Sequence, residues 1–320
     1  MPCGVGDRAG APGRGPPRRS DTVPGVTAQD RILVAGEALV DLVPTADGTL
    51  SPYPGGGPFT TARALGRLGR PVAFAGRLST DRFGQEMAAM LAADGVADDA
   101  LERTDAPTTL ALAEVDAAGA ARYRFYTEGT SAPGLTAATA GAPAVLHAGT
   151  LGLVLEPMAG AVEALVARLA GRALVMLDPN IRPAAVGDEG GYRARLDRVL
   201  AHSDVVKVSD EDLHWLAPGE TLLDRGPAVT LVTRGGAGAT VHGAFGSLEV
   251  AAPPVAVVDT IGAGDTFSAG WLAWWTERGL GPDALGDRDA VADATAFACR
   301  AAALTCSRAG ADPPRRDELD

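Results

Sequence analysis

The sequence predicts an α/β fold in which a mostly parallel central sheet is flanked by helices. Two observations indicate this class. Short apolar segments alternate with segments of helical periodicity, and a glycine-rich turn at residues 262–264 joins an apolar segment to a helix. The composition agrees, since 46% of the 320 residues are apolar and 21% are charged, as in a globular domain. A chain of this length can bury the core of one sizeable domain.

The expected elements alternate between strand and helix from residue 31 onward. A buried strand at 32–34 precedes a helix at 59–68, and a strand at 72–75 precedes a helix at 83–93. Further strands are expected after helical segments, at residues 144–147, 173–177, 204–208 and 229–232. Ligands of such a sheet bind at the carboxyl ends of its strands, so the polar residues that follow the strands are site candidates.

Two stretches interrupt this alternation, at residues 39–53 and 108–126. In the second, residues 109–115 and 121–126 flank an Asp-Ala-Ala-Gly turn, which is typical of antiparallel hairpin strands. Residues 1–30 are rich in Pro, Gly, Arg and Ala and lack an apolar core, so we expect a disordered tail ahead of a domain at 31–320.

Charge and cysteine usage exclude several classes of protein. A formal net charge of −12 argues against a nucleic-acid partner, which calls for a basic face. No apolar stretch reaches the ~18 residues of a membrane span. The three cysteines, Cys3, Cys299 and Cys306, show no metal-ligand spacing, so reduced thiols and a cytoplasmic protein are expected.

The segment 257–270 carries the strongest chemical signal. An apolar strand is expected to run through Val257 and Val258 into a turn with Gly262 and Gly264, and a helix follows from there. Backbone N–H groups at such a helix start bind anions, and Asp265 lies among them. A carboxylate beside a phosphate site suits removal of a proton from an attacking hydroxyl. The alternative is that Asp265 only caps the helix.

The segment 259–265, Asp-Thr-Ile-Gly-Ala-Gly-Asp, resembles the C-terminal motif of the ribokinase-like (PfkB) carbohydrate kinases. Residues 55–69, with three glycines ahead of a helix ending in Leu-Gly, resemble the family's N-terminal motif. The resemblance covers residues 31 to 314. It implies a ribokinase-like three-layer fold with a small β lid at 39–53 and 108–126. It also implies ATP and Mg²⁺ as cofactors, is compatible with K⁺, and suggests a homodimer through the lid strands.

The resemblance also assigns roles to residues. Asp265 is the implied base, and the donors at Gly262, Ala263 and Gly264 stabilise charge that develops on the phosphate. The implied sugar contacts are Asp41, Gly55, Gly56, Thr60 and Arg182. Thr60 departs from the family, which usually has Asn there, so the hydrogen bonds to the sugar must differ. Thr127 departs as well, because an arginine often stands there, and its loss weakens the case for an acidic sugar.

The remaining implied contacts follow the later strands. The nucleotide-binding residues are Ser209, Thr233, Gly235, Gly238, Asp259 and Thr260, and the metal residues are Asp212, through water, and Asp178. Plainer interpretations stay open: an Asx turn at 178–182, a helix N-terminus at 209–212 and a tight turn at 233–238.

Competing kinase classes are excluded by the lysine content. Lys207 is the only lysine, it lies in an apolar strand, and no Gly-x-x-x-x-Gly-Lys-Ser/Thr motif occurs, which excludes a P-loop enzyme. No His-Arg-Asp or Asp-Phe-Gly motif of a protein kinase accompanies it. Phosphates must therefore be held by backbone N–H groups, arginine or a metal.

Together these observations predict an ATP-dependent sugar kinase that transfers the γ-phosphate to a primary hydroxyl, with fructose as the first candidate. A 2-keto-3-deoxygluconate kinase or a ribokinase-type acceptor is the alternative within the class. A catalytically silent sugar- or nucleotide-binding module is the alternative from another class. Because Asp265 and its glycines are intact, the enzyme is favoured.

Overall fold

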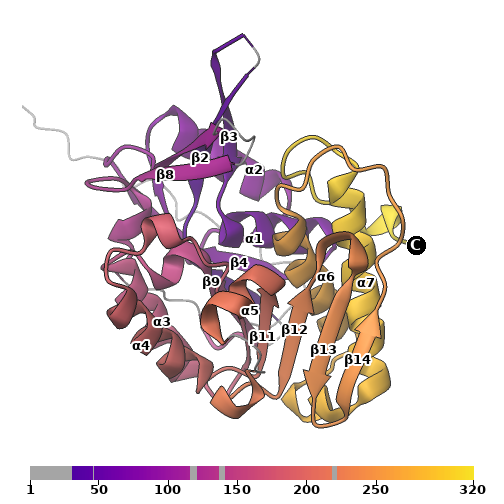
Figure 1. The fold of residues 1–320 in the computed structure, drawn as a ribbon. Helices are drawn as coiled ribbons and strands as arrows, with labels where there is room; N and C mark the ends of the chain where they lie inside the picture. Colours follow the sequence, from indigo (N-terminus) through magenta and orange to yellow (C-terminus); the bar gives the residue numbers. More distant parts are fainter. Residues whose placement is uncertain (1–30, 46, 116–120, 137–140, 218–221) are drawn as a thin grey trace, which may run out of the picture.

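The computed structural model describes residues 31–45, 47–115, 121–136, 141–217 and 222–320; the predicted tail at 1–30 and the turn at 116–119 lie outside them. An eight-stranded sheet forms the centre, with the order β14-β13-β12-β11-β10-β9-β1-β4 (Figure 1). Its strands are β1 (Ile32–Ala35), β4 (Val72–Ala75), β9 (Val145–Gly149), β10 (Leu174–Asp178), β11 (Val205–Ser209), β12 (Val229–Thr233), β13 (Ala239–Gly243) and β14 (Gly246–Val250).

The six strands from β4 to β12 pair in parallel, and β13 and β14 add an antiparallel edge, which confirms the mostly parallel sheet. Alternate residues of each strand face opposite sides: Leu174 and Met176 of β10 join one core, and Val175 and Leu177 join the other. The first core is covered by α1 (Gly57–Arg67), α2 (Arg82–Ala93), α6 (Ala263–Glu277) and α7 (Arg288–Cys306). The second is covered by α3 (Met158–Leu169), α4 (Glu189–Leu200) and α5 (Asp210–Leu216). The central sheet and the two sets of helices on its faces thus form three layers.

Helix α6 is fixed in the first core by aromatic packing. Trp271 and Trp275 are fully buried and their rings stack, with centroids 4.6 Å apart. Gly270 allows close contact with α7, because a Cβ there would lie 3.1 Å from Cα of Ala298. The N-terminus of α6 therefore has a fixed position.

Among the described residues, no helix has the length and apolar content needed to span a membrane.

A second sheet of four strands stands apart from the main sheet, at the top of Figure 1, and we call it the lid. It consists of β3 (Leu50–Gly55), β2 (Leu39–Pro44), β7 (Leu110–Val115) and β8 (Ala121–Tyr126), in that order. Two antiparallel pairs, β2 with β3 and β7 with β8, join through a parallel contact between β2 and β7. The predicted hairpin strands are thus confirmed. A small parallel pair, β5 (Arg77–Ser79) and β6 (Glu102–Thr104), lies apart from both sheets.

Candidate functional site

The start of α6 forms the glycine turn that the sequence predicted, but the segment before it differs. Residues 251–262 form no strand, and Val257 and Val258 are 64% and 63% exposed, so the predicted apolar strand is wrong. Their segment is held instead by the end of α7, because the N–H groups of Val258 and Asp259 donate to the carbonyl oxygen of Cys306. Apolar β-branched residues favour a strand only where a sheet offers them a partner.

Gly262 is the N-cap of α6 and has a left-handed backbone, with φ +76°. A Cβ at this position would lie 2.8 Å from Cβ of Ala311 and 3.2 Å from Cγ2 of Thr60. A side chain would therefore be strained and crowded at once. The glycine brings the start of α6, the start of α1 and the C-terminal segment around Ala311 into contact.

Asp265 lies in the first turn of α6, with its carboxylate directed toward the start of α1. A Cβ on Gly57 would lie 3.0 Å from its Oδ1. Burial within the protein raises the pKa of Asp265 to about 7, and the nearby Asp178 carboxylate acts in the same direction, against Lys207 and Arg182. The carboxylate is therefore half-protonated near neutral pH and suited to exchange a proton.

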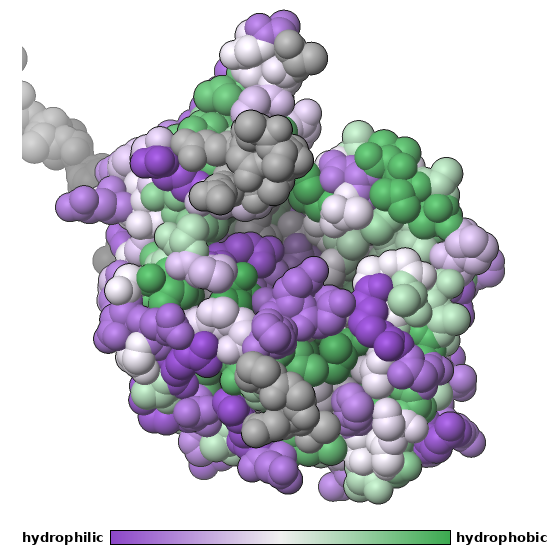
Figure 2. Space-filling view, in the orientation of Figure 1, coloured by the Kyte–Doolittle hydropathy of each residue, from purple (hydrophilic) through white to green (hydrophobic). Residues whose placement is uncertain are grey.

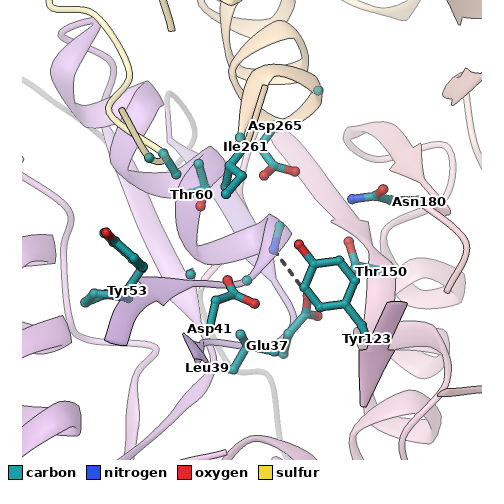
Figure 3. Close-up of a pocket in the computed structure, with 18 of the residues that line it drawn as sticks. Glu37, Leu39, Asp41, Tyr53, Thr60, Tyr123, Thr150, Asn180, Ile261 and Asp265 are labelled. Carbon is teal, nitrogen blue, oxygen red and sulfur yellow. Dashed lines mark hydrogen bonds between the residues drawn. The ribbon is translucent and has the colours of Figure 1, made fainter. Parts of the chain in front are cut away.

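Asp265 faces a cavity of about 400 Å³ between the lid and the main sheet, where Figure 2 shows the molecule hollowed. In Figure 3, Asp265 lies on one side of this space, and Asp41, Glu37 and Tyr123 lie on the other. Ten predicted site residues line the cavity: Asp41, Gly55, Gly56, Thr60, Arg182, Asp259, Thr260, Gly262, Gly264 and Asp265. Segments as distant in sequence as 37 and 311 thus meet around one space the size of a small ligand.

The lid wall of the cavity carries Asp41, on β2. Its carboxylate occupies the space that a side chain on Gly55 would need, so glycine at this position of β3 makes room for it. Burial raises the pKa of Asp41 to about 6, and the Arg182 guanidinium opposes that rise. Above that pH, Asp41 presents two acceptor oxygens to the cavity, which can accept hydrogen bonds from two adjacent hydroxyl groups of one ligand.

Sequence reasoning missed Glu37 and Thr150, which also line the cavity. Asn180, which the family resemblance implies to face the phosphate and metal region, lines it as well. Glu37 is fully buried, and its carboxyl accepts the N–H groups of Gly152 at 3.0 Å and Gly57 at 3.3 Å. Burial raises its pKa to about 8. Thr150 and Asn180 have positive φ angles, 51° and 39°, a strain that gathers at functional sites. The available signal was Glu37 itself, an acid between two apolar segments.

Several predicted residues do not line the cavity: Ala263, Asp178, Ser209, Asp212, Thr233, Gly235 and Gly238. Ser209 and Asp212 form a capping box at the start of α5. The Asp212 oxygens accept the N–H groups of Ile181 at 2.8 Å and of Ser209 at 3.1 Å. The plainer interpretation, a helix N-terminus, therefore accounts for both side chains.

Direct metal ligation does not fit Asp212, for which the sequence predicted a contact through water. Both oxygens of Asp212 already accept backbone N–H groups. Asp178 is 2% exposed, and its Oδ2 lies 3.0 Å from Nζ of Lys207, whereas its buried Oδ1 has no hydrogen-bond partner among the described residues. Within the described ranges, no cluster of three or more His, Cys, Asp or Glu side chains could hold a metal ion.

Comparisons with known proteins agree with this geometry. Residues 29–318 match the family model described as pfkB family carbohydrate kinase. A fructokinase of Rhizobium leguminosarum bv. trifolii is 40% identical over 260 residues, which cover 76% of this chain and 78% of the relative. The structure of a Xylella fastidiosa fructokinase with bound ATP has a TM-score of 0.83 and 27% identity, covering 91% of this chain and 97% of that one. A double mutant of Vibrio cholerae fructokinase, with fructose, ADP and a potassium ion bound, has a TM-score of 0.82 and 25% identity, covering 91% and 97%.

Proposed function

Because the chain belongs to the pfkB family of carbohydrate kinases, we propose that it transfers the γ-phosphate of ATP to a primary hydroxyl of fructose. One observation carries the proposal: Asp265 at the start of α6 and Asp41 on the lid line the same cavity. A base beside an anion-binding turn, opposite a carboxylate that can hold hydroxyls, is the arrangement that this transfer needs. The fructokinases among the similar proteins support fructose as the acceptor.

The mechanism follows from the position of Asp265. The carboxylate accepts the proton of the sugar hydroxyl, whose oxygen forms a bond to the γ-phosphorus while the bond to the β-phosphate oxygen breaks. Backbone N–H groups at Gly262 and Gly264, which line the cavity, face the charge that develops on the phosphoryl oxygens. The predicted N–H donor at Ala263 is not available, because it donates to the carbonyl oxygen of Thr260 at 3.2 Å. Tyr123, from lid strand β8, lines the cavity and limits the entry of water.

The two substrates are expected to bind in different parts of the cavity. We assign Asp41, Gly55, Gly56, Thr60 and Arg182 to the sugar, and Asp259 and Thr260 to the nucleotide. The nucleotide then extends along the carboxyl ends of β11 and β12, where Ser209, Thr233, Gly235 and Gly238 lie. Asp212, through water, and the unpaired Oδ1 of Asp178 are the groups that would hold a Mg²⁺ ion brought in with the nucleotide, and the ion would offset the charge of the phosphates. The potassium-bound relative supports a K⁺ requirement as well.

The lid also supports a homodimer. Its two edge strands, β3 and β8, carry exposed Leu50, Tyr53 and Tyr126 at 50%, 47% and 49%. Open edges with apolar side chains favour pairing with another strand. Sedimentation equilibrium of the full chain tests this arrangement.

A coupled ADP-release assay with Mg-ATP tests the function, across fructose, ribose, glucose and 2-keto-3-deoxygluconate. We expect turnover to require a sugar and to be fastest with fructose. Fastest turnover of 2-keto-3-deoxygluconate or ribose would keep the kinase class and replace the acceptor. Binding of ATP and sugar without ADP release would indicate a silent module and contradict the proposal.

Asparagine in place of Asp41 is expected to raise KM for fructose about 10- to 100-fold, because hydrogen bonds to a charged acceptor are the ones lost. KM for ATP should change less than about threefold, since Asp41 lies on the lid side of the cavity. Initial rates over a matrix of both substrates measure the two constants. A rise in KM for ATP alone would contradict the assignment of Asp41 to the sugar.

The rate should fall on the acidic side of neutral pH. Because the pKa of Asp265 is raised to about 7, the carboxylate form needed as base is lost as pH drops through that value. We therefore expect kcat/KM for fructose, which reports the free enzyme, to decrease about tenfold per pH unit below ~6.5 and to level off above ~8. Asp178, Asp41, Lys207 and Arg182 all act on this group. A profile that stays flat down to pH ~4.5, near the ordinary range of an aspartate, would contradict Asp265 as the base.

A further inference from the structure

Lys207 is the only lysine of the chain, and it lies in the middle of β11 with 3% of its surface exposed. A buried ammonium group is costly unless it is paired. Its Nζ lies 3.0 Å from Oδ2 of Asp178, at the end of the neighbouring strand β10. Neither residue lines the cavity, so contact with a substrate does not explain the pair.

The strand register directs Lys207 toward the start of α6. Met176 pairs with Val205, so Asp178 and Lys207, two residues further along each strand, face the same side of the sheet as these two. That side is covered by α6. A Cβ on Gly264 would lie 2.8 Å from Nζ of Lys207. The ammonium group therefore lies against the backbone of the anion-binding turn.

The surroundings of the ammonium group are mostly acidic. Burial alone lowers the pKa of Lys207, but Asp178, followed by Asp265 and Asp212, outweighs burial and raises it. His147 is also buried nearby, and burial together with Lys207 lowers its pKa to about 3, so the imidazole is neutral. Lys207 is thus a permanent positive charge between Asp178 and the first turn of α6.

We propose that Lys207 is a positioning residue for phosphoryl transfer, whose charge reinforces the backbone N–H groups at the start of α6 as they hold the transferring phosphoryl group. The inference rests on the function proposed above. Asp178 holds the ammonium group in place, and Gly264 lets it approach, because any side chain there would occupy the same space. A fixed charge in a site closed to water acts most strongly where charge develops during the reaction.

The test separates this role from simple pairing with Asp178. Lys207→Met removes the charge but leaves Asp178 unpaired, which can itself unfold the protein. In a second variant, Asp178→Asn is combined with Lys207→Met, so that the pair becomes neutral at similar volume, a change that buried pairs often tolerate. We expect this double variant to lower kcat about 10- to 100-fold, with KM for ATP and fructose within about threefold. Wild-type kcat in the double variant would overturn the proposal.

Calorimetric titration with ADP, and with ADP plus aluminium fluoride as a mimic of the transferring group, gives a second readout. The double variant should lose about 10- to 100-fold in affinity for the mimic and less than threefold for ADP. Equal losses for both ligands would overturn the proposal. Arg172→Met, which removes an exposed positive charge ahead of β10, should leave both affinities unchanged. A wild-type protein that is inactive on every sugar would contradict the proposed function. The role of Lys207 could still be decided, because the affinities for ADP with aluminium fluoride and for ADP alone are measured without turnover.

Discussion

Asparagine at position 265 is expected to lower kcat by about 10²- to 10⁴-fold, the usual contribution of a positioned general base. The amide keeps the shape of the carboxylate but cannot accept the proton of the attacking hydroxyl. KM for ATP and for fructose should stay within about threefold, because the cavity wall around position 265 is otherwise unchanged. Steady-state kinetics with the coupled ADP-release assay, over both substrates, gives all three constants.

Stability distinguishes this loss from misfolding. The folded state raises the pKa of Asp265 to about 7, so above that pH the carboxylate is ionised at a cost in folding free energy. Since asparagine carries no charge, Asp265→Asn should melt at the same or a higher temperature at pH 8. Asp289→Asn makes the same change at a side chain that is 93% exposed and should leave kcat and melting unchanged. Near-normal kcat in the Asp265 variant would rule out the base mechanism.

Much of the main sheet could be predicted because its signals are local. The strand at 72–75 is found at Val72–Ala75, and the helix expected at 83–93 is found at Arg82–Ala93, where the side chain of Asp81 caps it. Apolar runs of four or five residues between helical segments leave little choice in an α/β chain. The lid hairpin at 110–126 was predicted because an Asp-Ala-Ala-Gly turn separates its two strand segments.

The segment at 257–258 shows where local signals fail. Two adjacent valines favour a strand by composition, but these side chains are mostly exposed and the backbone bonds to the end of α7. Whether a β-branched segment joins a sheet depends on a free edge nearby, which is a property of the assembled fold. The turn at the neighbouring Gly262, by contrast, could be predicted, because the left-handed backbone that favours glycine is a local requirement of the turn itself.

The site was predictable where a motif carries its own chemistry. Asp265, Asp41 and Arg182, from distant segments, do line one cavity. Glu37 and Lys207 could not be interpreted from the sequence, because their roles depend on burial and on which backbone each one meets. A single lysine in an apolar strand gave no sign that its ammonium group lies under Gly264.

Alanine at position 57 is expected to lower kcat about 100-fold, as a displacement of about 1 Å in a reacting group can. Gly57 is the first residue of α1, and a Cβ there would lie 2.6 Å from Oγ1 of Thr150 and 3.0 Å from Oδ1 of Asp265. Both distances are too short for an unstrained contact, so the side chains or the helix must move. The same steady-state assay measures the loss, with melting temperature as the check on folding.

Two further variants show whether the displaced group is Asp265. Gly281→Ala adds the same methyl group where nothing lies within 4 Å and should leave kcat unchanged. Thr150→Ala, combined with Gly57→Ala, removes the nearer contact. It should recover only part of the rate, because the contact with Oδ1 of Asp265 remains. Full recovery would mean that Thr150 alone transmits the effect. Wild-type kcat in Gly57→Ala itself would mean that Asp265 has room to adjust, and that transfer does not depend on a carboxylate fixed against the start of α1.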